Sequence, residues 1–247
     1  MLIYGFHAVL AQLQQHPEAL QILYLQQDKH DPKSTELANL AASHAIPIEY
    51  LPKKSLATMT RDAVHQGMIA LLKAGSVIKS DTLEAIIPQS LRQNQLLLVL
   101  DGITDPHNLG ACLRCADAFQ VDALIIPKDR AAQVSPIVHK VSCGASHTIP
   151  IVTVNNLAQT LKTLKAQGFW TYGLDSAAEE SLFQLEFTKP TALVLGAEGS
   201  GLRRLTKEHC DFLVKIPMLG HVDSLNVSVA TGISLFEIRR QRLLQGT

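Results

Sequence analysis

Three short stretches of this chain combine polar side chains with glycines or helix-start residues, and they are its best candidates for chemistry. They are DGITDPHNLGACLRCADAF (residues 101–119), LVLGAEGSGLRRL (193–205) and KIPMLGHVDSLNVSVATGISLFE (215–237). Each begins in or directly follows an apolar run typical of a buried strand. Because the carboxyl ends of parallel strands meet at one edge of a sheet, we expect the three stretches to lie together and to bind a small molecule.

The first stretch offers an asparagine and an arginine on one helix. The helix is predicted to begin near Asn108, with Arg114 about two turns further on. An asparagine that caps a helix and an arginine on a solvated face would explain both residues without any activity. Alone, this stretch leaves the two interpretations about equal.

The second stretch places three glycines within six residues, Gly196, Gly199 and Gly201, after a buried strand. Such glycines suggest a close backbone approach to a ligand. The spacing G-x-x-G-x-G is not the G-x-G-x-x-G of dinucleotide-binding loops, and Glu198 would repel a pyrophosphate. A cationic ligand, or an alcohol that needs a hydrogen-bond acceptor, suits Glu198 better. The alternative is a tight turn that precedes an acidic helix start.

The third stretch starts a long apolar helix with Ser224 and Asn226. We expect Ser224 to cap this helix, which explains the serine without any function. A cap at Ser224 leaves Asn226 unexplained, because asparagine is a mediocre residue within a first helical turn. Asn226 is therefore a candidate site residue.

Composition limits the possible classes of protein. The chain has 247 residues, 47% of them apolar, and equal numbers of basic and acidic residues, 22 of each. It is expected to be a soluble globular protein with no membrane span and no signal peptide, working in the cytoplasm. The four cysteines lack the paired spacing of a zinc site, so we expect no metal and interpret them as buried thiols. Zero net charge neither requires nor excludes nucleic acid as a partner.

Two α/β parts are predicted. In the first, helices near 6–15 and 34–44 and a helical turn near Ser55 alternate with strands near 22–25, 48–51 and 68–72. The polar segment that follows is a linker. In the second part, buried runs near 96–102, 123–127, 149–154, 169–174, 192–196 and 212–217 alternate with helices near 109–119, 157–167 and 225–244. Apolar runs that alternate with helices indicate a parallel sheet covered on both faces.

Taken together, the three stretches resemble the SpoU/TrmH family of RNA ribose 2′-O-methyltransferases, within the SPOUT superfamily. The resemblance rests on N-x-G-x-x-x-R (108–114), G-A-E-G-x-G (196–201) and I-P-M…S-L-N-V-S-x-A (216–230), and covers the chain from about residue 96 onward. Three motifs in the family's order are a specific signal. The N-terminal part, with YGFHAVL and HQGMIALL, more loosely resembles the L30e-like RNA-binding domain found in many members.

The resemblance implies an architecture. It predicts an α/β chain with an L30e-like substrate-binding domain at 1–75, a linker at 76–94 and a SPOUT-type methyltransferase domain at 95–247. In this family the C-terminal part of the chain passes through a loop to form a deep trefoil knot, and two chains form a homodimer. The knot binds S-adenosylmethionine, and by match of motifs the cofactor-binding residues are Leu195, Gly196, Ile216, Met218 and Leu225.

The resemblance also assigns roles in the reaction. Asn108, Arg114, Glu198, Ser224 and Asn226 match the family's polar site positions. Since a guanidinium keeps its proton below a pH of about 12, we interpret Arg114 as a ligand of the adjacent RNA phosphate and of the developing alkoxide, rather than as the base. The two asparagines would orient the ribose and the arginine, Glu198 would accept hydrogen bonds, and Ser224 would face the cofactor.

The expected substrate follows from the same resemblance. It is the ribose 2′-hydroxyl of a guanosine in 23S rRNA or its precursor, with Lys53, Lys54 and Arg61 of the N-terminal part contacting the surrounding RNA. A tRNA ribose methyltransferase is the nearest alternative, and the extra N-terminal domain favours rRNA. A non-catalytic RNA-binding or assembly factor is less favoured, because the polar site residues are intact. A nicotinamide dehydrogenase is the most distant alternative.

Overall fold

The computed structural model describes residues 2–15, 17–29, 31–60, 64–73, 83 and 92–245. The chain divides into two compact units, one formed by residues 1–78 with 143–148 and the other by residues 79–142 with 149–247. Most of the predicted linker at 76–94 lies outside the described residues, so its boundaries stay a prediction.

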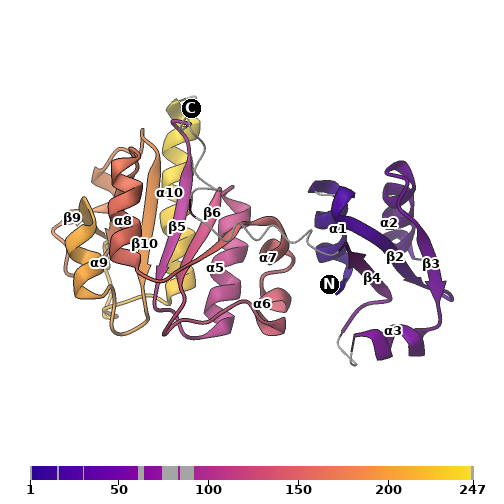
Figure 1. Ribbon diagram of the computed structural model, residues 1–247. Helices are drawn as coiled ribbons and strands as arrows, with labels where there is room; N and C mark the ends of the chain where they lie inside the picture. The colour runs from indigo at the N-terminus through magenta and orange to yellow at the C-terminus, as the bar shows by residue number, and fades with distance from the viewer. Residues whose placement is uncertain are drawn as a thin grey trace. The chain divides into compact units, whose positions relative to one another are not determined.

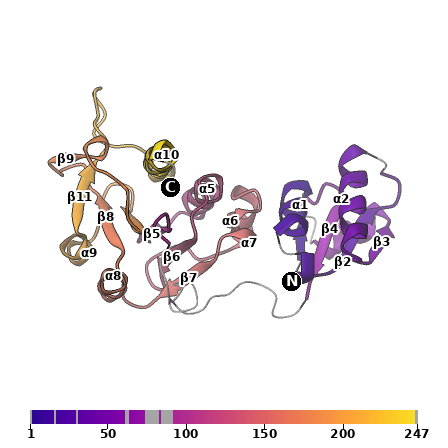
Figure 2. The same cartoon turned by 90° about the horizontal axis from the view of Figure 1, so that it is seen from above.

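The first unit contains a four-stranded mixed sheet. Its elements are β1 (Leu2–Tyr4), α1 (Phe6–Gln15), a 3-10 turn η1 (Pro17–Ala19), β2 (Leu20–Gln26), α2 (Pro32–Ser43), β3 (Ile48–Leu51), α3 (Lys53–Met59) and β4 (Met68–Leu72). The strand order is β1-β4-β2-β3, in which only β2 and β3 are parallel. Helices α1 and α2 lie side by side against one face of this sheet (Figure 2). Leu13, Leu23 and Leu37 are fully buried in its core.

The second unit is built around a seven-stranded sheet (Figure 1). Its elements are β5 (Leu96–Asp101), α5 (Pro106–Ala118), β6 (Ala123–Pro127), α6 (Pro136–Val141), β7 (Ile151–Val154), α8 (Leu157–Ala166), β8 (Trp170–Leu174), β9 (Glu180–Ser181), a 3-10 turn η2 (Leu182–Gln184), β10 (Thr191–Gly196), α9 (Arg204–His209), β11 (Phe212–Lys215) and α10 (Val227–Gln245). The short helix α7 (Ala145–Thr148) falls in the first unit.

All pairings in this larger sheet are parallel, and the strand order is β7-β6-β5-β10-β8-β11-β9. Helices α5 and α10 cover one face and α8 and α9 the other (Figure 2). Every residue of β5 and β6 is buried. The predicted parallel sheet covered on both faces is therefore confirmed, because strands buried on both sides need apolar residues at every position.

The last helix is less apolar on its buried face than its sequence suggests. Thr231 and Ser234 are buried with Leu235, whereas the apolar Val229 and Phe236 are 49% and 55% exposed. No helix of the described residues is long and apolar enough to cross a membrane.

Several short elements escaped prediction, among them β1, α6, β9 and α9. The interpretation of all four cysteines as buried thiols is also only partly right. Cys112 is buried, Cys115 and Cys210 are half-buried, and Cys143 is exposed. Burial raises the pKa of Cys112 to about 12, so this thiol is not activated for redox chemistry.

Candidate active site

A pocket of about 420 Å³ opens at the carboxyl edge of the larger sheet, where β8, β10 and β11 end. All five residues predicted to bind the cofactor line it: Leu195, Gly196, Ile216, Met218 and Leu225. Two predicted polar residues, Glu198 and Ser224, line it as well. The strand-end rule thus places two of the three sequence motifs around one cavity.

The glycine loop has this shape because the chain folds back on itself. A Cβ atom on Gly196 would lie 2.0 Å from the backbone carbon of Gly201, so no other residue fits there. Ala197 and Gly201 form an antiparallel bridge, and the Gly201 amide donates to the Ala197 carbonyl at 2.8 Å. Gly199 and Gly201 have φ values of +78° and +66°, which favour glycine. The glycines are therefore required by the turn itself. Because all three also line the pocket, their close approach to a ligand stays a prediction.

The third motif meets the first through two asparagines. The side-chain amide of Asn226 donates to Oδ1 of Asn108 at 3.0 Å, and the Asn108 amide donates to Oε2 of Glu198 at 3.3 Å. This chain of hydrogen bonds joins the first turn of α5 and the loop after β10 to the start of α10. One member of each sequence motif takes part in it.

The start of α10 differs from the prediction. The helix begins at Val227, and Oδ1 of Asn226 accepts hydrogen bonds from the amide and the hydroxyl of Ser228, at 2.9 and 2.6 Å. Asn226 is thus the capping residue, and the assignment of this role to Ser224 is wrong. Ser224 is instead exposed on the pocket wall. Because cap and bridge use different atoms, Asn226 performs both functions.

The start of α5 also differs. Oδ1 of Asp105 accepts from the amide of His107 and caps the helix, so Asn108 lies within the first turn rather than at the cap. Its amide group is thereby free to join Glu198 and Asn226. The alternative explanation of Asn108 as a simple helix cap is excluded.

Arg114 lies on α5, six residues beyond Asn108, and is exposed. Within the part of the chain that the structure describes, no hydrogen bond or ion pair holds its side chain, and it is not among the residues that line the pocket. The structure therefore leaves its guanidinium available for a partner from outside the chain.

The pocket carries more negative than positive charge. Glu198, Asp175 and Asp223 line it together with one basic residue, Lys207. Lys207 is paired with Asp175, with Nζ 2.5 Å from Oδ2. Burial alone would raise the pKa of Asp175, but hydrogen bonds from Lys207 and the Ala177 amide lower it overall. The carboxylate charge of Glu198 has no such basic partner among the described residues.

Sequence reasoning missed Asp175, Ser176 and Lys207 in this pocket. Asp175 and Ser176 directly follow β8, so their position after a predicted parallel strand was an available signal. Lys207 comes from α9, which was not predicted.

The predicted RNA-binding residues lie in the first unit. Lys53 and Lys54 are exposed at the start of α3, whereas Arg61 lies outside the described residues. In the described ranges, no group of three or more His, Cys, Asp or Glu side chains is placed to hold a metal ion.

Residues 95–236 match the SpoU rRNA Methylase family, and residues 2–76 match the RNA 2′-O ribose methyltransferase substrate-binding domain. The chain belongs to the SpoU methylase family.

Its relatives match nearly the whole chain. The 23S rRNA (guanosine-2′-O-)-methyltransferase RlmB of Pseudomonas aeruginosa is 50% identical over 240 residues, which cover 97% of this chain and 96% of that protein. The enzyme of the same name from Escherichia coli K12 is 47% identical, with 98% of each chain covered. Among solved structures, the SpoU methyltransferase AviRb of Streptomyces viridochromogenes with the cofactor AdoMet has a TM-score of 0.78 at 24% identity, covering 99% of this chain and 91% of that one. This last likeness concerns the fold.

Proposed function

We propose that the chain transfers a methyl group from S-adenosylmethionine to the ribose 2′-hydroxyl of a guanosine in 23S rRNA. The observation that carries this proposal is the pocket at the carboxyl edge of the larger sheet, lined by all five residues that the family motifs assign to the cofactor. Relatives named for this reaction match the chain through both units at 47–50% identity.

The residues that line the pocket fit S-adenosylmethionine. Leu195, Ile216, Met218 and Leu225 give apolar walls for a flat base. The carboxylate of Glu198 suits a ligand that carries positive charge. When bound, S-adenosylmethionine supplies an electrophilic methyl group on a cationic sulfur.

The protein's own residues then position the acceptor. The Asn226–Asn108–Glu198 chain fixes three side chains that can donate to or accept from a ribose. Orientation of a hydroxyl in line with its reaction partner can contribute up to roughly 7–11 kcal/mol. Asn108 and Asn226 orient the ribose and Arg114, Glu198 accepts hydrogen bonds from them, and Ser224 faces the cofactor.

Arg114 acts as an electrostatic residue in this proposal. Its guanidinium has no partner within the described residues and stays charged at neutral pH, so it suits the phosphate next to the acceptor ribose and the developing alkoxide. A group that does not lose its proton cannot serve as a general base.

The N-terminal unit, here assigned to residues 1–75, recognises the surrounding RNA through Lys53, Lys54 and Arg61. The exposure of the two lysines at the start of α3 supports this role. The match of residues 2–76 to a substrate-binding domain favours rRNA over the tRNA alternative, because the relatives named for 23S rRNA align with nearly the whole chain, this part included.

The knot, the homodimer and the cytoplasmic location belong to the same proposal. Residues that follow β11 line one pocket together with the loop after β10, and a C-terminal segment that passes through that loop would require this proximity.

The exposed apolar side chains Leu219, Val229 and Phe236 are available to a second copy of the chain. Sedimentation of the full chain tests the dimer. Ribosomal RNA as substrate implies the cytoplasm.

The activity is tested by mapping ribose methylation in total cellular RNA with and without the active protein. The expected result is one guanosine in 23S rRNA that loses its 2′-O-methyl group when the protein is absent. A change confined to tRNA would support the alternative substrate. An unchanged map, together with no binding of S-adenosylmethionine in a titration, would support the non-catalytic interpretation.

A further inference from the structure

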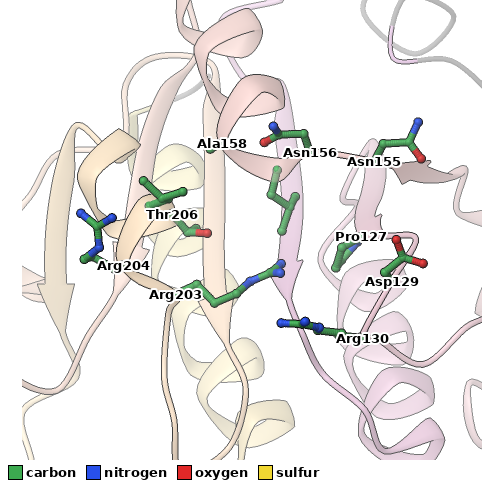
Figure 3. Close-up of a pocket in the computed structure, with 11 residues that line it drawn as sticks. Pro127, Asp129, Arg130, Asn155, Asn156, Ala158, Arg203, Arg204 and Thr206 are labelled. Carbon is green, nitrogen blue, oxygen red and sulfur yellow. The ribbon is translucent and has the colours of Figure 1, made fainter.

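A second cavity, of about 550 Å³, lies in the methyltransferase unit apart from the cofactor pocket. It is formed by the end of β6, the start of α8 and the segment that leads into α9 (Figure 3). Three arginines line it, Arg130, Arg203 and Arg204, against a single acidic residue, Asp129. The proposed methyl transfer uses none of these four residues.

Arg203 is held in place by the carboxylate of Asp101. Its backbone amide donates to Oδ2 of Asp101 at 2.9 Å, and its guanidinium pairs with the other oxygen of the same carboxylate. The Asp101 side chain is fully buried, whereas that of Arg203 is 48% exposed. A buried carboxylate therefore fixes an arginine that lines the cavity.

Arg130 faces the same space without a partner. It is exposed, and no hydrogen bond or ion pair holds its side chain within the described ranges. Figure 3 shows its guanidinium and that of Arg203 pointing into the same part of the cavity, while Asp129 lies apart from both. Asp101 already balances the charge of Arg203, so Arg130 brings an unpaired positive charge to this space, which a bound anion can compensate.

The start of α8 adds neutral donors. Oδ1 of Asn156 caps the helix by accepting from the Gln159 amide at 3.1 Å, and Asn156, Leu157 and Ala158 line the cavity. The amides of the first two residues of a helix have no carbonyl partner inside it, and the helix dipole favours negative charge there. Two guanidinium groups and a helix start thus face one cavity.

We propose that this cavity binds a phosphate of the RNA backbone, as a second RNA contact of the methyltransferase unit. The inference rests on the proposed function for the identity of the polyanion. One continuous segment supports the link between the two sites, because residues 196–201 line the cofactor pocket and residues 203–206 line this cavity. Both cavities lie at the carboxyl edge of the sheet, so one RNA strand can contact both.

The test compares the RNA affinity of the wild-type full chain with that of the Arg130→Gln variant. Arg130 is chosen because its side chain has no partner among the described residues, so its replacement leaves no buried charge unpaired. The probe is unmodified 23S rRNA transcribed in vitro, and its affinity is measured as salt is raised. We expect affinity to fall about 5- to 10-fold and the slope of log affinity against log salt to drop by about 1. Binding of S-adenosylmethionine, measured by calorimetry, stays unchanged.

The matched control is Lys162→Gln, which removes one positive charge from an exposed position on α8 outside the cavity lining. If Arg130→Gln behaves as this control does, the proposal is wrong. It is also wrong if inorganic phosphate binds the wild type at Arg130 while the RNA affinity of Arg130→Gln is unchanged. If RNA binds through Arg130 but receives no methyl group, the proposed phosphate site is supported and the proposed methyl transfer is contradicted. If the wild type binds no RNA, both fail.

Discussion

The side-chain amide of Asn226 donates to Oδ1 of Asn108 at 3.0 Å, across 118 positions of sequence. This bond connects the start of α10 to the first turn of α5, two helices that pack on the same face of the sheet (Figure 2). The same Asn108 then reaches Glu198 on the glycine loop. Asn226 therefore couples helix packing to the geometry of the candidate site.

Replacement of Asn226 separates its two functions. Asn226→Ser keeps a side-chain oxygen for the cap but loses the donor to Asn108, whereas Asn226→Ala loses both. We expect the free energy of unfolding of the alanine variant to be about 1 kcal/mol lower than that of the wild type. That of the serine variant should be nearly unchanged. Both should transfer methyl groups about 10- to 100-fold more slowly, because the acceptor site loses its orientation. Urea unfolding and single-turnover methylation provide the measurements. A serine variant with wild-type turnover would show that the Asn108 contact does not matter.

Arg114→Lys tests the electrostatic role of the arginine. Lysine keeps the charge but cannot offer two parallel N–H donors to a phosphate or an alkoxide. We expect turnover to fall by a factor of about 10² to 10³, with unchanged affinity for S-adenosylmethionine. Rates and calorimetric titration measure the two effects separately. Near-full turnover of Arg114→Lys would rule out the bidentate role.

Arg242, near the end of α10, forms hydrogen bonds with the segments that precede β5 and β10. It is only 1% exposed and donates to the backbone carbonyls of Asn94, Phe187 and Lys189. Arg242→Met would leave these carbonyls without their donor, so we expect a loss of about 3 kcal/mol or more in the free energy of unfolding. Urea unfolding measures it. Arg130→Met, at an exposed arginine without an internal partner, is the control and should keep the wild-type midpoint.

Asp31 makes the stability of the first unit depend on pH. Its carboxylate caps α2 by accepting from Ser34, and these hydrogen bonds, with Lys29 nearby, lower its pKa from 3.8 to about 2. Because the folded pKa is depressed, the contribution is fully present above pH 3.8 and is lost as the pH falls through about 2. Asp31→Ala should weaken α2 by about 1 kcal/mol at neutral pH, and by progressively less toward pH 2.

Hydrogen exchange of the α2 amides measures this difference. The control is Asp28→Ala, at an exposed position outside the helix, which should leave exchange unchanged at every pH. An Asp31→Ala difference that persists undiminished at pH 2 would contradict the capping role.

The parallel sheet could be predicted because it depends on local patterns, and five residues of the pocket wall could be predicted because they match the family's motifs. Runs such as 96–101 and 123–127 are apolar at nearly every position, and Leu195, Gly196, Ile216, Met218 and Leu225 stand at strand ends or after them. Residues at the carboxyl ends of parallel strands converge whatever the strand order. The central position of β10 between β5 and β8 is a long-range pairing that no local pattern encodes.

The errors have local physical causes. Both Ser224 and Asn226 are good capping residues, and the choice between them depends on where the backbone of α10 begins, which tertiary contacts decide. The requirement of the turn for Gly196 could not be predicted, because the sequence does not show the backbone contact between Gly196 and residues 201–202. The short helix α9, which supplies Lys207, is too brief to show an amphipathic period.

The most direct test of the proposed activity identifies the methylated product. Unmodified 23S rRNA is incubated with the full chain and isotopically labelled S-adenosylmethionine, then digested to nucleosides and separated by chromatography. We predict that the label appears in 2′-O-methylguanosine alone, and that Arg114→Lys reduces its yield. Label in a base-methylated nucleoside, or in the 2′-O-methyl derivative of another nucleoside, would contradict the proposed reaction.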